Sequence, residues 1–241
     1  MGKRQFKPGN MLYPVPAVLV TVADREGNSN IFTVAWAGTI CTNPPMLSIS
    51  VRPERHSYHM MKETGEFVVN LTTESMAWAT DYCGVRSGRD VDKWKETGLT
   101  PEKANVVDVP VIKESPVNIE CRVVKVEELG SHHMFIADVV AVDVDEKDTF
   151  HLSMAKPLAY SHGRYYGMGE ELGSFGYSVR KQEKSAKTGR KTSKSAEKAG
   201  GAGKVRKPAD VNGGKKATAR PEQSRKANGQ KSGGPRNDKK R

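Results

Sequence analysis

The segment TVAWAGTICTNPPMLSISVRPERHSY, residues 33–58, combines a strand-like pattern with a cluster of anion-binding side chains. It contains two apolar, strand-like runs separated by Asn43-Pro44-Pro45, and it ends in a turn that carries two arginines, a histidine and a serine. Short runs of β-branched and apolar residues between such chain breakers are typical of strands. A strand that ends in anion-binding side chains predicts a phosphorylated ligand along the strand, with its phosphate at the turn.

Further strand-like runs lie on both sides of this segment. Residues 15–22 form a β-branched, apolar run, residues 24–28 have the composition of a turn, and residues 31–37 are expected to return as the second strand of a hairpin. The remaining predicted strands are residues 46–51, 66–71, 118–129 and 133–144.

Helices are predicted to be few and short. One spans residues 58–64, with Ser57 as its N-cap and Gly65 at its end, and a second spans residues 73–82. Residues 84–98 are polar and contain glycine, which predicts a loop with at most one helical turn. Many strands with few helices and no βα alternation favour a mainly β fold, a barrel with helical decoration, over a Rossmann sheet.

Charge divides the chain into two parts. The 241 residues contain 39 Lys+Arg and 28 Asp+Glu, but residues 181–241 alone hold 20 Lys+Arg against 5 Asp+Glu. These last residues include no Phe, Trp, Tyr, Leu, Ile or Met, so they have too little apolar surface to offset the entropy of ordering. We expect a globular domain over residues 1–178 and a disordered basic tail over residues 179–241.

The cysteines and the N-terminal residues indicate the cellular compartment in which the protein is expected. Cys41, Cys83 and Cys121 form no CxxC pair, which argues against a zinc site and a disulfide framework. The N-terminus lacks the apolar run of a signal peptide, and no stretch approaches the ~20 apolar residues of a membrane helix. The sequence therefore predicts a soluble, cytoplasmic protein that does not associate with membranes.

The turn at residues 52–57 has the chemistry of an anion site. Free N–H groups at the start of the predicted helix favour an anion, and Ser57 adds a hydroxyl donor. Arg52 and Arg55 carry planar guanidinium groups that suit phosphate oxygens. The alternative is a solvated turn in which Glu54 pairs with one of the arginines, and the local sequence alone does not separate the two.

A set of motifs occurs in a fixed order over about residues 13–173. The pieces are YPVPAVLVTV, NIFTVAWAGTICTNPPMLSISVRPERHSY, TGEFVVNL, CGVRSGRDVDKW, SPVNIECRV, GSHHMFIADVVAV and a late Tyr-Tyr-Gly. Together they resemble the flavin reductase family of FMN-binding split β-barrels, and especially its flavoredoxin-like branch. The basic tail has no counterpart in this resemblance.

The resemblance implies a homodimer with one FMN per subunit near the interface, and NADH or NADPH as co-substrate. The isoalloxazine ring would lie along residues 36–41, where backbone N–H groups can meet flavin O2, O4 and N5. Arg52, Ser57 and Lys93 would hold the phosphate, and His132 is the catalytic candidate, as a proton or charge partner. The full set of implied flavin-binding residues is Asn30, Thr33, Trp36, Ala37, Gly38, Thr39, Cys41, Arg52, Ser57, Lys93, His132 and Tyr165.

Several of these residues have a structural alternative. Trp36 could be a core residue, and Lys93 could pair with Asp90 or Asp92 instead of serving as a mobile ammonium for the phosphate. His132 and His133 face opposite sides if both lie on a strand, and the match to GSH selects His132 as the ligand-facing one.

The residue types of Cys41 and Tyr165 suggest different roles beside the flavin. Cys41 suits packing better than redox chemistry, and Tyr165 can stack on the flavin ring. No metal site is expected, because the histidines have no carboxylate or cysteine at ligand spacing.

The resemblance implies an oxidoreductase that passes a hydride from NAD(P)H to FMN and electrons onward to a protein or small-molecule acceptor. A flavoredoxin-like electron carrier without NAD(P)H activity is the first alternative. The second is a protein that binds nucleic acid or another polyanion through residues 181–241, by sequence-independent phosphate contacts. The sequence leaves open the choice of NADH or NADPH, the acceptor, whether FMN is bound tightly or exchanged, and the role of the tail.

Overall fold

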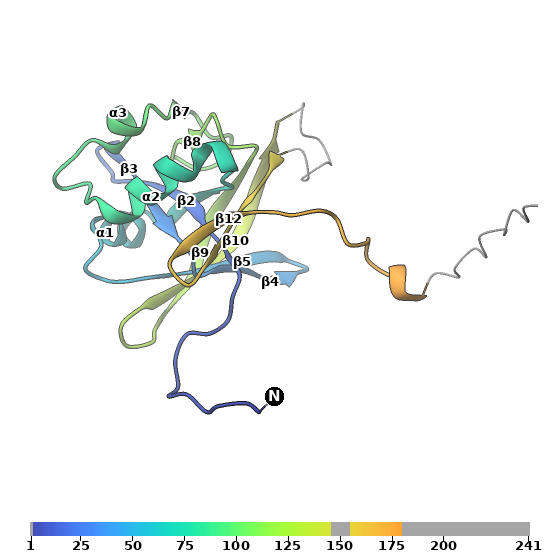
Figure 1. Ribbon diagram of the computed structural model, residues 1–241. Coiled ribbons are helices and arrows are strands. Elements are labelled where there is room, and N and C mark those ends of the chain that lie inside the picture. The colour runs from blue at the N-terminus through green and yellow to red at the C-terminus, as the bar shows by residue number, and fades with distance from the viewer. Residues whose placement is uncertain (1, 146–154, 180–241) are drawn as a thin grey trace, which may run out of the picture. The chain divides into compact units, whose positions relative to one another are not determined.

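The predicted strands form one large antiparallel sheet in the computed structural model, which describes residues 2–145 and 155–179 (Figure 1). The strand order is β3-β2-β6-β9-β10-β5-β4. The bounds are β2 Val18–Ala23, β3 Ser29–Val34, β4 Ala37–Thr42, β5 Pro45–Val51, β6 Glu66–Asn70, β9 Val117–Glu128 and β10 His133–Val144. The predicted tail begins at residue 179, so all of it beyond Val179 lies outside the described residues.

Strand β2 is buried at every position because it has a hydrophobic core on each side. Val18, Val20 and Val22 face the larger core, whereas Leu19 faces a second core beneath the helices, as the two-residue period of a strand requires. Phe67 is completely buried in the larger core. Burying an apolar side chain of this size contributes roughly 1.5–3 kcal/mol to stability.

The helices are α1 His56–Thr64, η1 Glu74–Met76, α2 Ala77–Val85, α3 Lys93–Thr97 and η2 Tyr177–Val179. Helix α1 packs into the larger core, whereas α2 and α3 cover the second core on the opposite face of β2 and β3. Gly65 ends α1 with a φ of 72°, a left-handed conformation that glycine adopts without strain, as predicted. Among the described residues, no helix combines the length and apolar character needed to cross a membrane.

The predicted N-cap was wrong. The N-cap of α1 is Arg55, which has extended dihedral angles and no capping side-chain bond, and Ser57 lies inside the helix. Ser57 is buried there and its hydroxyl oxygen accepts a hydrogen bond from Asn30. A serine on the buried face of the first turn thus serves the tertiary structure rather than the helix end.

Two predicted strands divide in the structure. The run at residues 15–22 becomes β1 (Val15–Pro16) and β2, because β1 leaves the large sheet to pair with β11 (Leu158–Ser161). Strand β11 also pairs with β12 (Arg164–Gly167), which completes a three-stranded sheet. A smaller pair is formed by β7 (Pro101–Glu102) and β8 (Val111–Ile112).

The second predicted strand that divides gives the two end strands of the large sheet. The strand predicted at residues 31–37 ends at Val34, and a new strand, β4, begins at Ala37. Strand β3 pairs with β2, whereas β4 pairs with β5, so two consecutive strands lie at opposite ends of the strand order. The backbone N–H of Ser50 donates to the carbonyl of Trp36 (2.9 Å), which holds the crossing chain. Trp36 therefore lies in the segment where the chain crosses from one end of the strand order to the other.

Candidate functional site

The turn after β5 and the loop after α2 enclose a small polar cavity of about 150 Å³. We call it the anion pocket because cationic side chains outnumber its carboxylates. Strand β3, the first turn of α1 and the loop between α2 and α3 supply its walls. The lining residues are Asn30, Phe32, Glu54, Arg55, His56, Ser57, Val85, Arg86, Ser87, Gly88, Arg89 and Lys93.

A buried hydrogen bond fixes a hydroxyl group in the anion pocket. Asn30 Nδ2 donates to Ser57 Oγ (2.8 Å), and the two side chains are 6% and 1% exposed. Because a serine hydroxyl has one proton to donate and Asn30 occupies an acceptor position, the Ser57 proton remains for another partner. Gly88 closes over this pair: a Cβ atom there would lie 2.7 Å from Asn30 Cγ, so only glycine fits without displacement.

Lys93 is buried, with 3% of its surface exposed. Its ammonium group donates to the carbonyl oxygens of Ile31 and Cys83, both at 2.8 Å, which leaves one of three donors for a further acceptor. Burial lowers the pKa of Lys93 to about 8; the nearby Cys83 opposes this and the charge of Arg55 adds to it. A buried cation held only by carbonyl groups is costly, and such perturbed groups are enriched at functional sites.

Two alternative pairings that the sequence left open, Lys93 with an aspartate and the Glu54 carboxylate with an arginine, do not occur among the described residues. Lys93 bonds carbonyl oxygens rather than the carboxylates of Asp90 or Asp92, and Asp92 instead accepts the backbone N–H of Lys95 to cap α3. The prediction of a mobile ammonium was also wrong, because Lys93 is 3% exposed and the carbonyl oxygens of Ile31 and Cys83 hold its ammonium group. Glu54 is joined to Arg89 through its backbone carbonyl, at 3.3 Å from Nη1.

Arg55 connects the anion pocket to two other cavities. Its Nη1 donates to the carbonyl oxygen of Gly84 (3.0 Å), which ties the turn before α1 to the end of α2. The guanidinium group lines all three cavities. Arg55 was predicted to suit phosphate oxygens but is not among the flavin-binding residues that the resemblance implies.

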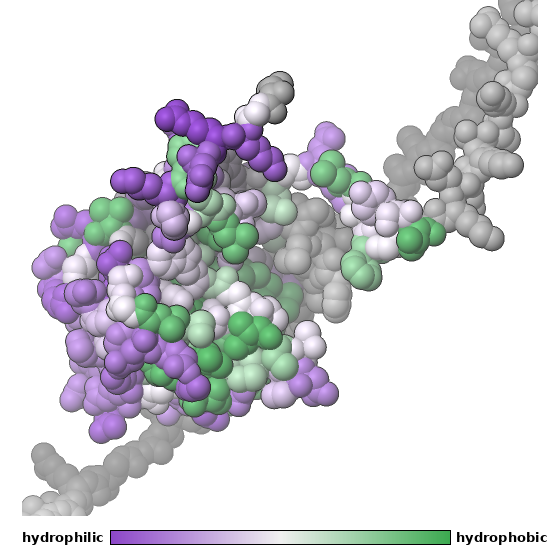
Figure 2. All heavy atoms as spheres, turned by 90° about the horizontal axis from the view of Figure 1, so that it is seen from below, coloured by the Kyte–Doolittle hydropathy of each residue, from purple (hydrophilic) through white to green (hydrophobic). Residues whose placement is uncertain are grey.

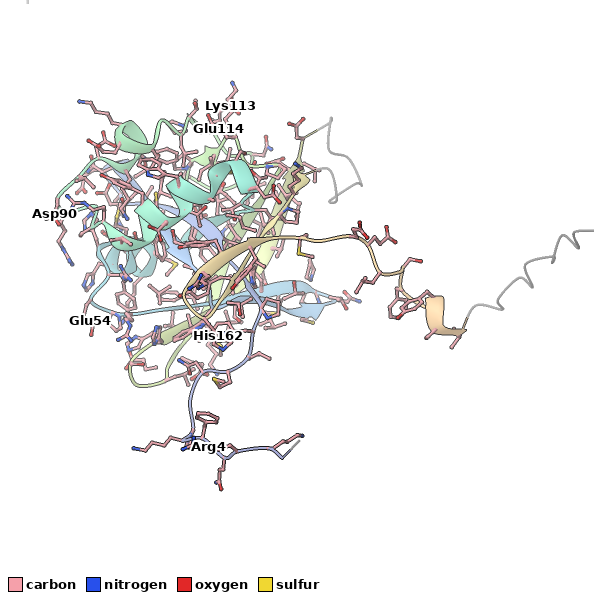
Figure 3. The ribbon with its side chains drawn as sticks, viewed as in Figure 1. Arg4, Glu54, Asp90, Lys113, Glu114 and His162 are labelled. Atoms are coloured by element: carbon pink, nitrogen blue, oxygen red, sulfur yellow. The ribbon has the colours of Figure 1, made fainter. Side chains whose placement is uncertain are left out.

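The second cavity, of about 360 Å³, we call the aromatic cavity. It is lined by Tyr13, Ala17, Thr33, Ala35, Trp36, Arg55, Asp81, Gly84, Val85, Tyr160, Gly163 and Tyr165. Trp36 is 39% exposed, so it is not the core residue of the structural alternative. The Tyr13 ring lies 4.4 Å from that of His162, which Figure 3 labels.

Tyr165 is the most perturbed phenol of this cavity. Burial raises its pKa to about 12, and the charge and hydrogen bond of Asp81 contribute in the same direction, as does Tyr160. The rings of Tyr160 and Tyr165 lie 5.5 Å apart and tilted by 59°. Tyr165 is therefore protonated at neutral pH, with its hydroxyl group oriented by Asp81.

The third cavity, of about 140 Å³, we call the histidine cavity. The His132 ring packs against Trp36 with centroids 4.3 Å apart, and Arg52 shares the same cavity. Burial lowers the pKa of His132 and the positive charges of Arg52 and Arg55 add to this, so the imidazole is neutral at neutral pH. His133 turns away, with its Nδ1 2.7 Å from the hydroxyl oxygen of Tyr58, so the adjacent histidines diverge as predicted.

The structure groups some of the implied flavin-binding residues and separates others. Asn30, Ser57 and Lys93 meet in the anion pocket, and Thr33, Trp36 and Tyr165 meet in the aromatic cavity. Arg52 lies with His132 rather than with Ser57 and Lys93. Four residues line none of the three cavities and follow one another along the partly exposed edge strand β4: Ala37, Gly38, Thr39 and Cys41.

Sequence reasoning missed residues from two segments. Arg86, Gly88 and Arg89 come from the loop after α2, where the motif RSGR places two arginines around a glycine and could have indicated an anion site. Tyr13 and Asp81 gave no comparable signal, because only the folded chain brings them together. Within the part of the chain that the structure describes, no three His, Cys, Asp or Glu side chains gather as metal ligands.

Comparison with known proteins identifies the family. The model of the flavin reductase like domain matches residues 10–169. The chain belongs to this family. Flavoredoxin of Desulfovibrio vulgaris (Miyazaki F) superposes on this flavin reductase-like chain with a TM-score of 0.69 and 30% identity, covering 74% of this chain and 100% of that one. The split-barrel fold predicted from the sequence is thereby confirmed.

Sequence relatives of this flavin reductase-like chain include proteins of Archaeoglobus fulgidus and Streptomyces pristinaespiralis. A protein of Archaeoglobus fulgidus without an assigned function is 30% identical over 156 residues, which cover 60% of this chain and 87% of that protein. The NADH:riboflavin 5'-phosphate oxidoreductase of Streptomyces pristinaespiralis is 21% identical over 147 residues, covering 59% of this chain and 78% of that protein.

Proposed function

We propose that the chain binds FMN and acts as an NAD(P)H-dependent flavin oxidoreductase. The observation that carries the proposal is the anion pocket, in which buried Lys93 has no carboxylate partner among the residues that the structure describes. Arg55 connects this pocket to a cavity walled by aromatic rings. FMN consists of a phosphate and a planar ring joined by a flexible chain, so the phosphate suits the anion pocket and the ring suits the aromatic cavity. Membership of the flavin reductase-like family and the activity named for the Streptomyces relative support the same conclusion.

In this proposal the anion pocket holds the phosphate group. Lys93 donates its remaining N–H, Ser57 donates its hydroxyl proton, and the N-terminus of α1 adds its partial positive charge. Asn30 acts on the phosphate indirectly, because its amide fixes the position of Ser57 Oγ. Arg55 reaches from this pocket toward the aromatic cavity and balances the second phosphate charge.

The aromatic cavity would hold the isoalloxazine ring. When bound, FMN supplies the hydride and electron-transfer chemistry, which no amino-acid side chain provides. Trp36 and Tyr165 offer ring faces that exclude water from one side. The neutral His132 imidazole, packed on Trp36, can accept a proton when the charge of the site changes.

A flavoredoxin-like electron carrier is the second candidate, favoured by the similarity to the Desulfovibrio flavoredoxin. Both candidates require bound flavin, and they differ in the electron donor. Anaerobic addition of NADH or NADPH to the FMN-loaded protein separates them: bleaching of the long-wavelength flavin absorbance supports the reductase, and an unchanged spectrum supports the carrier. Failure to bind FMN or any other flavin under any condition would contradict both the reductase and the carrier proposals.

A homodimer fits the apolar surface of the sheet. Trp36 and Ile40 are 39% and 49% exposed, and Val142 and Val144 are 52% and 44% exposed on β10. Figure 2 shows apolar side chains gathered on the face seen from below, with hydrophilic ones alongside. Light scattering after gel filtration tests the proposal: an Ile40→Lys change should raise the fraction of monomer, and a wild-type monomer at all concentrations would contradict it.

The basic tail supports a separate proposal, that residues 181–241 bind polyanions. The proposal rests on their 20 Lys+Arg against 5 Asp+Glu. Binding of labelled DNA should be independent of sequence and should weaken steeply with salt, because it rests on counterion release. Removal of these residues should abolish this binding and leave flavin binding intact. An equal affinity with and without the tail would contradict the proposal.

A further inference from the structure

A hydrogen bond between two side chains that line none of the three cavities joins the two ends of the candidate site. The hydroxyl oxygen of Tyr58 lies 2.7 Å from His133 Nδ1. Tyr58 follows Ser57 in the first turn of α1, which walls the anion pocket, and His133 follows His132, which packs on Trp36. A single side-chain contact therefore connects the turn beside the anion pocket to the histidine beside the aromatic cavity.

The phenol of Tyr58 is fixed by the larger core. Tyr58 is 3% exposed, and its ring meets those of Phe135 and His133 nearly edge to face, with centroids 5.5 Å and 5.4 Å away. Lys62 Nζ lies 5.7 Å from the centroid of the same ring. A polar group at this depth is costly unless it is hydrogen-bonded, and His133 Nδ1 supplies the partner.

His133 is fixed in turn by the sheet and by α1. It is the first residue of β10, where it pairs with Glu128 of β9 and with Val51 of β5. Glu128 Oε1 lies 3.8 Å from His133 Nδ1, and Lys62 Nζ lies 3.9 Å from that carboxylate oxygen. The imidazole thus lies among ionisable groups of α1 and β9, while β5 contributes an apolar neighbour.

The direction of the His132 side chain depends on its neighbour. His132 ends the short loop between β9 and β10, where its carbonyl oxygen accepts the backbone N–H of Leu129 (3.0 Å) and its Nδ1 lies 3.0 Å from Ser131 Oγ. Successive side chains of an extended chain point to opposite sides. A His133 side chain held toward Tyr58 therefore turns His132 the other way, where its ring packs on Trp36.

We propose that Tyr58 is a positioning residue for the flavin reaction: by holding His133, its hydroxyl group keeps the His132 ring on Trp36 beside the aromatic cavity. The inference rests on the proposed function, in which His132 accepts a proton when the charge of the site changes. Misplacement of a reacting group by about 1 Å can cost about a hundredfold in rate, so a hydroxyl group outside the cavities can still affect the reaction.

The direct test follows the titration of His132 in the flavin-free full chain by nuclear magnetic resonance, with His132→Gln to identify its signal. Tyr58→Phe keeps the buried ring and removes the hydroxyl group. Burial is the first cause of the lowered pKa of His132, so a ring released toward solvent should titrate with a pKa closer to the ordinary 6.5. Tyr82→Phe is the matched control, because Tyr82 stacks on Trp78 of α2, and it should leave the titration unchanged.

The charged groups around His132 stay the same in this test. The positive charges of Arg52 and Arg55 lower its pKa further and Glu54 opposes them, and none of the three is altered in Tyr58→Phe. A rise in the pKa of His132 therefore reports a movement of its ring.

Replacements of His133 test the same bond from the other side. His133→Leu removes the partner of the phenol, whereas His133→Gln keeps a side chain that can bond to it. We expect the rate of reduction of bound FMN by NAD(P)H to fall about tenfold in Tyr58→Phe and in His133→Leu, with FMN affinity unchanged, and to recover in His133→Gln. The double variant Tyr58→Phe/His133→Leu should be no slower than either single variant, because both changes remove one shared interaction.

The outcomes separate this inference from the proposed function. An unchanged His132 titration in Tyr58→Phe and in His133→Leu, in chains that keep their circular dichroism spectrum, would overturn the inference, and so would rate losses that add in the double variant. A wild-type chain that binds no flavin, or takes no electrons from NAD(P)H, would instead overturn the proposed function. The titration of His132 would then still decide whether Tyr58 sets its position.

Discussion

The anion pocket and the aromatic cavity meet at Arg55 but are built in opposite ways. In the anion pocket Asn30, Ser57 and Lys93 are 6%, 1% and 3% exposed, and each has a hydrogen-bond partner. In the aromatic cavity Trp36 is 39% exposed, and the rings of Tyr160 and Tyr165 lie 5.5 Å apart and tilted by 59°. Buried, bonded donors are preorganised for one ligand group, whereas open aromatic walls leave room for a second reactant. We infer that affinity comes from the first region and reactivity from the second.

The largest effect should come from Lys93→Met, which removes the buried cation and keeps an unbranched apolar side chain in its place. Charge-assisted hydrogen bonds contribute roughly 1.5–3 kcal/mol, so FMN affinity should fall about tenfold to a hundredfold while riboflavin affinity changes little. Flavin fluorescence titration measures both. Lys95→Met on the same helix is the control, because Lys95 is exposed. Equal losses for FMN and riboflavin would mean that Lys93 acts through the fold.

Gly88→Ala tests whether the anion pocket depends on the position of Asn30. A Cβ atom at Gly88 would lie 2.7 Å from Asn30 Cγ, so the amide must move and Ser57 loses its fixed donor. Overpacking of this kind costs about 1–3 kcal/mol, and we expect FMN affinity to fall about tenfold. Gly169→Ala is the control, because its Cβ atom meets nothing within 4 Å. Unchanged affinity in Gly88→Ala would show that the pocket adapts.

The titration of Lys93 should make FMN binding depend on pH. Its pKa of about 8 in the free protein lies below the ordinary 10.5, and a bound phosphate stabilises the charged form, so binding takes up a proton above about pH 8. FMN affinity should therefore fall by up to about tenfold between about pH 7 and about pH 9. Calorimetry in buffers of different ionisation enthalpy measures this proton uptake, which Lys93→Met should abolish.

The same shift has a consequence for the stability of the flavin-free protein. A lowered folded-state pKa means that the unfolded chain binds more protons between about pH 8 and 10.5, so the contribution of Lys93 to stability rises with pH in this window. Denaturant unfolding at two pH values measures the slope. A stability that falls across this window in wild type, but not in Lys93→Met, would contradict the assigned burial.

Much of the fold could be predicted because it rests on local patterns. The two long strands joined at Gly130-Ser131 and the glycine that ends α1 lie where alternation and turn chemistry placed them. The division between β3 and β4 could not be predicted, since residues 31–37 are continuously strand-like. Only the pairing of β4 with β5 makes the chain cross there.

The candidate site was predicted less completely, for a similar reason. Lys93 lies in the polar sequence RDVDKW, which favours a solvated side chain, and its burial depends on carbonyl groups 10 and 62 residues away. Arg52 and Arg55 look equivalent in the sequence, and both line the histidine cavity, but Arg55, at the N-cap of α1, also lines the anion pocket, whereas Arg52 does not. Tertiary contacts, and not residue type, decide which arginine faces the anion pocket.

The smallest effect is expected in the aromatic cavity, from Asp81→Asn. Burial is the first cause of the raised pKa of Tyr165, and the charge and hydrogen bond of Asp81 add to it. Removing the charge should lower this pKa from about 12 part of the way toward its ordinary 10.0, since burial remains. Ultraviolet titration of phenolate absorbance, with Tyr165→Phe to identify the signal, measures the change. FMN affinity should hardly change, because Asp81 lines the aromatic cavity and not the anion pocket. A loss of affinity as large as that of Lys93→Met would mean that the two regions bind the flavin as one unit.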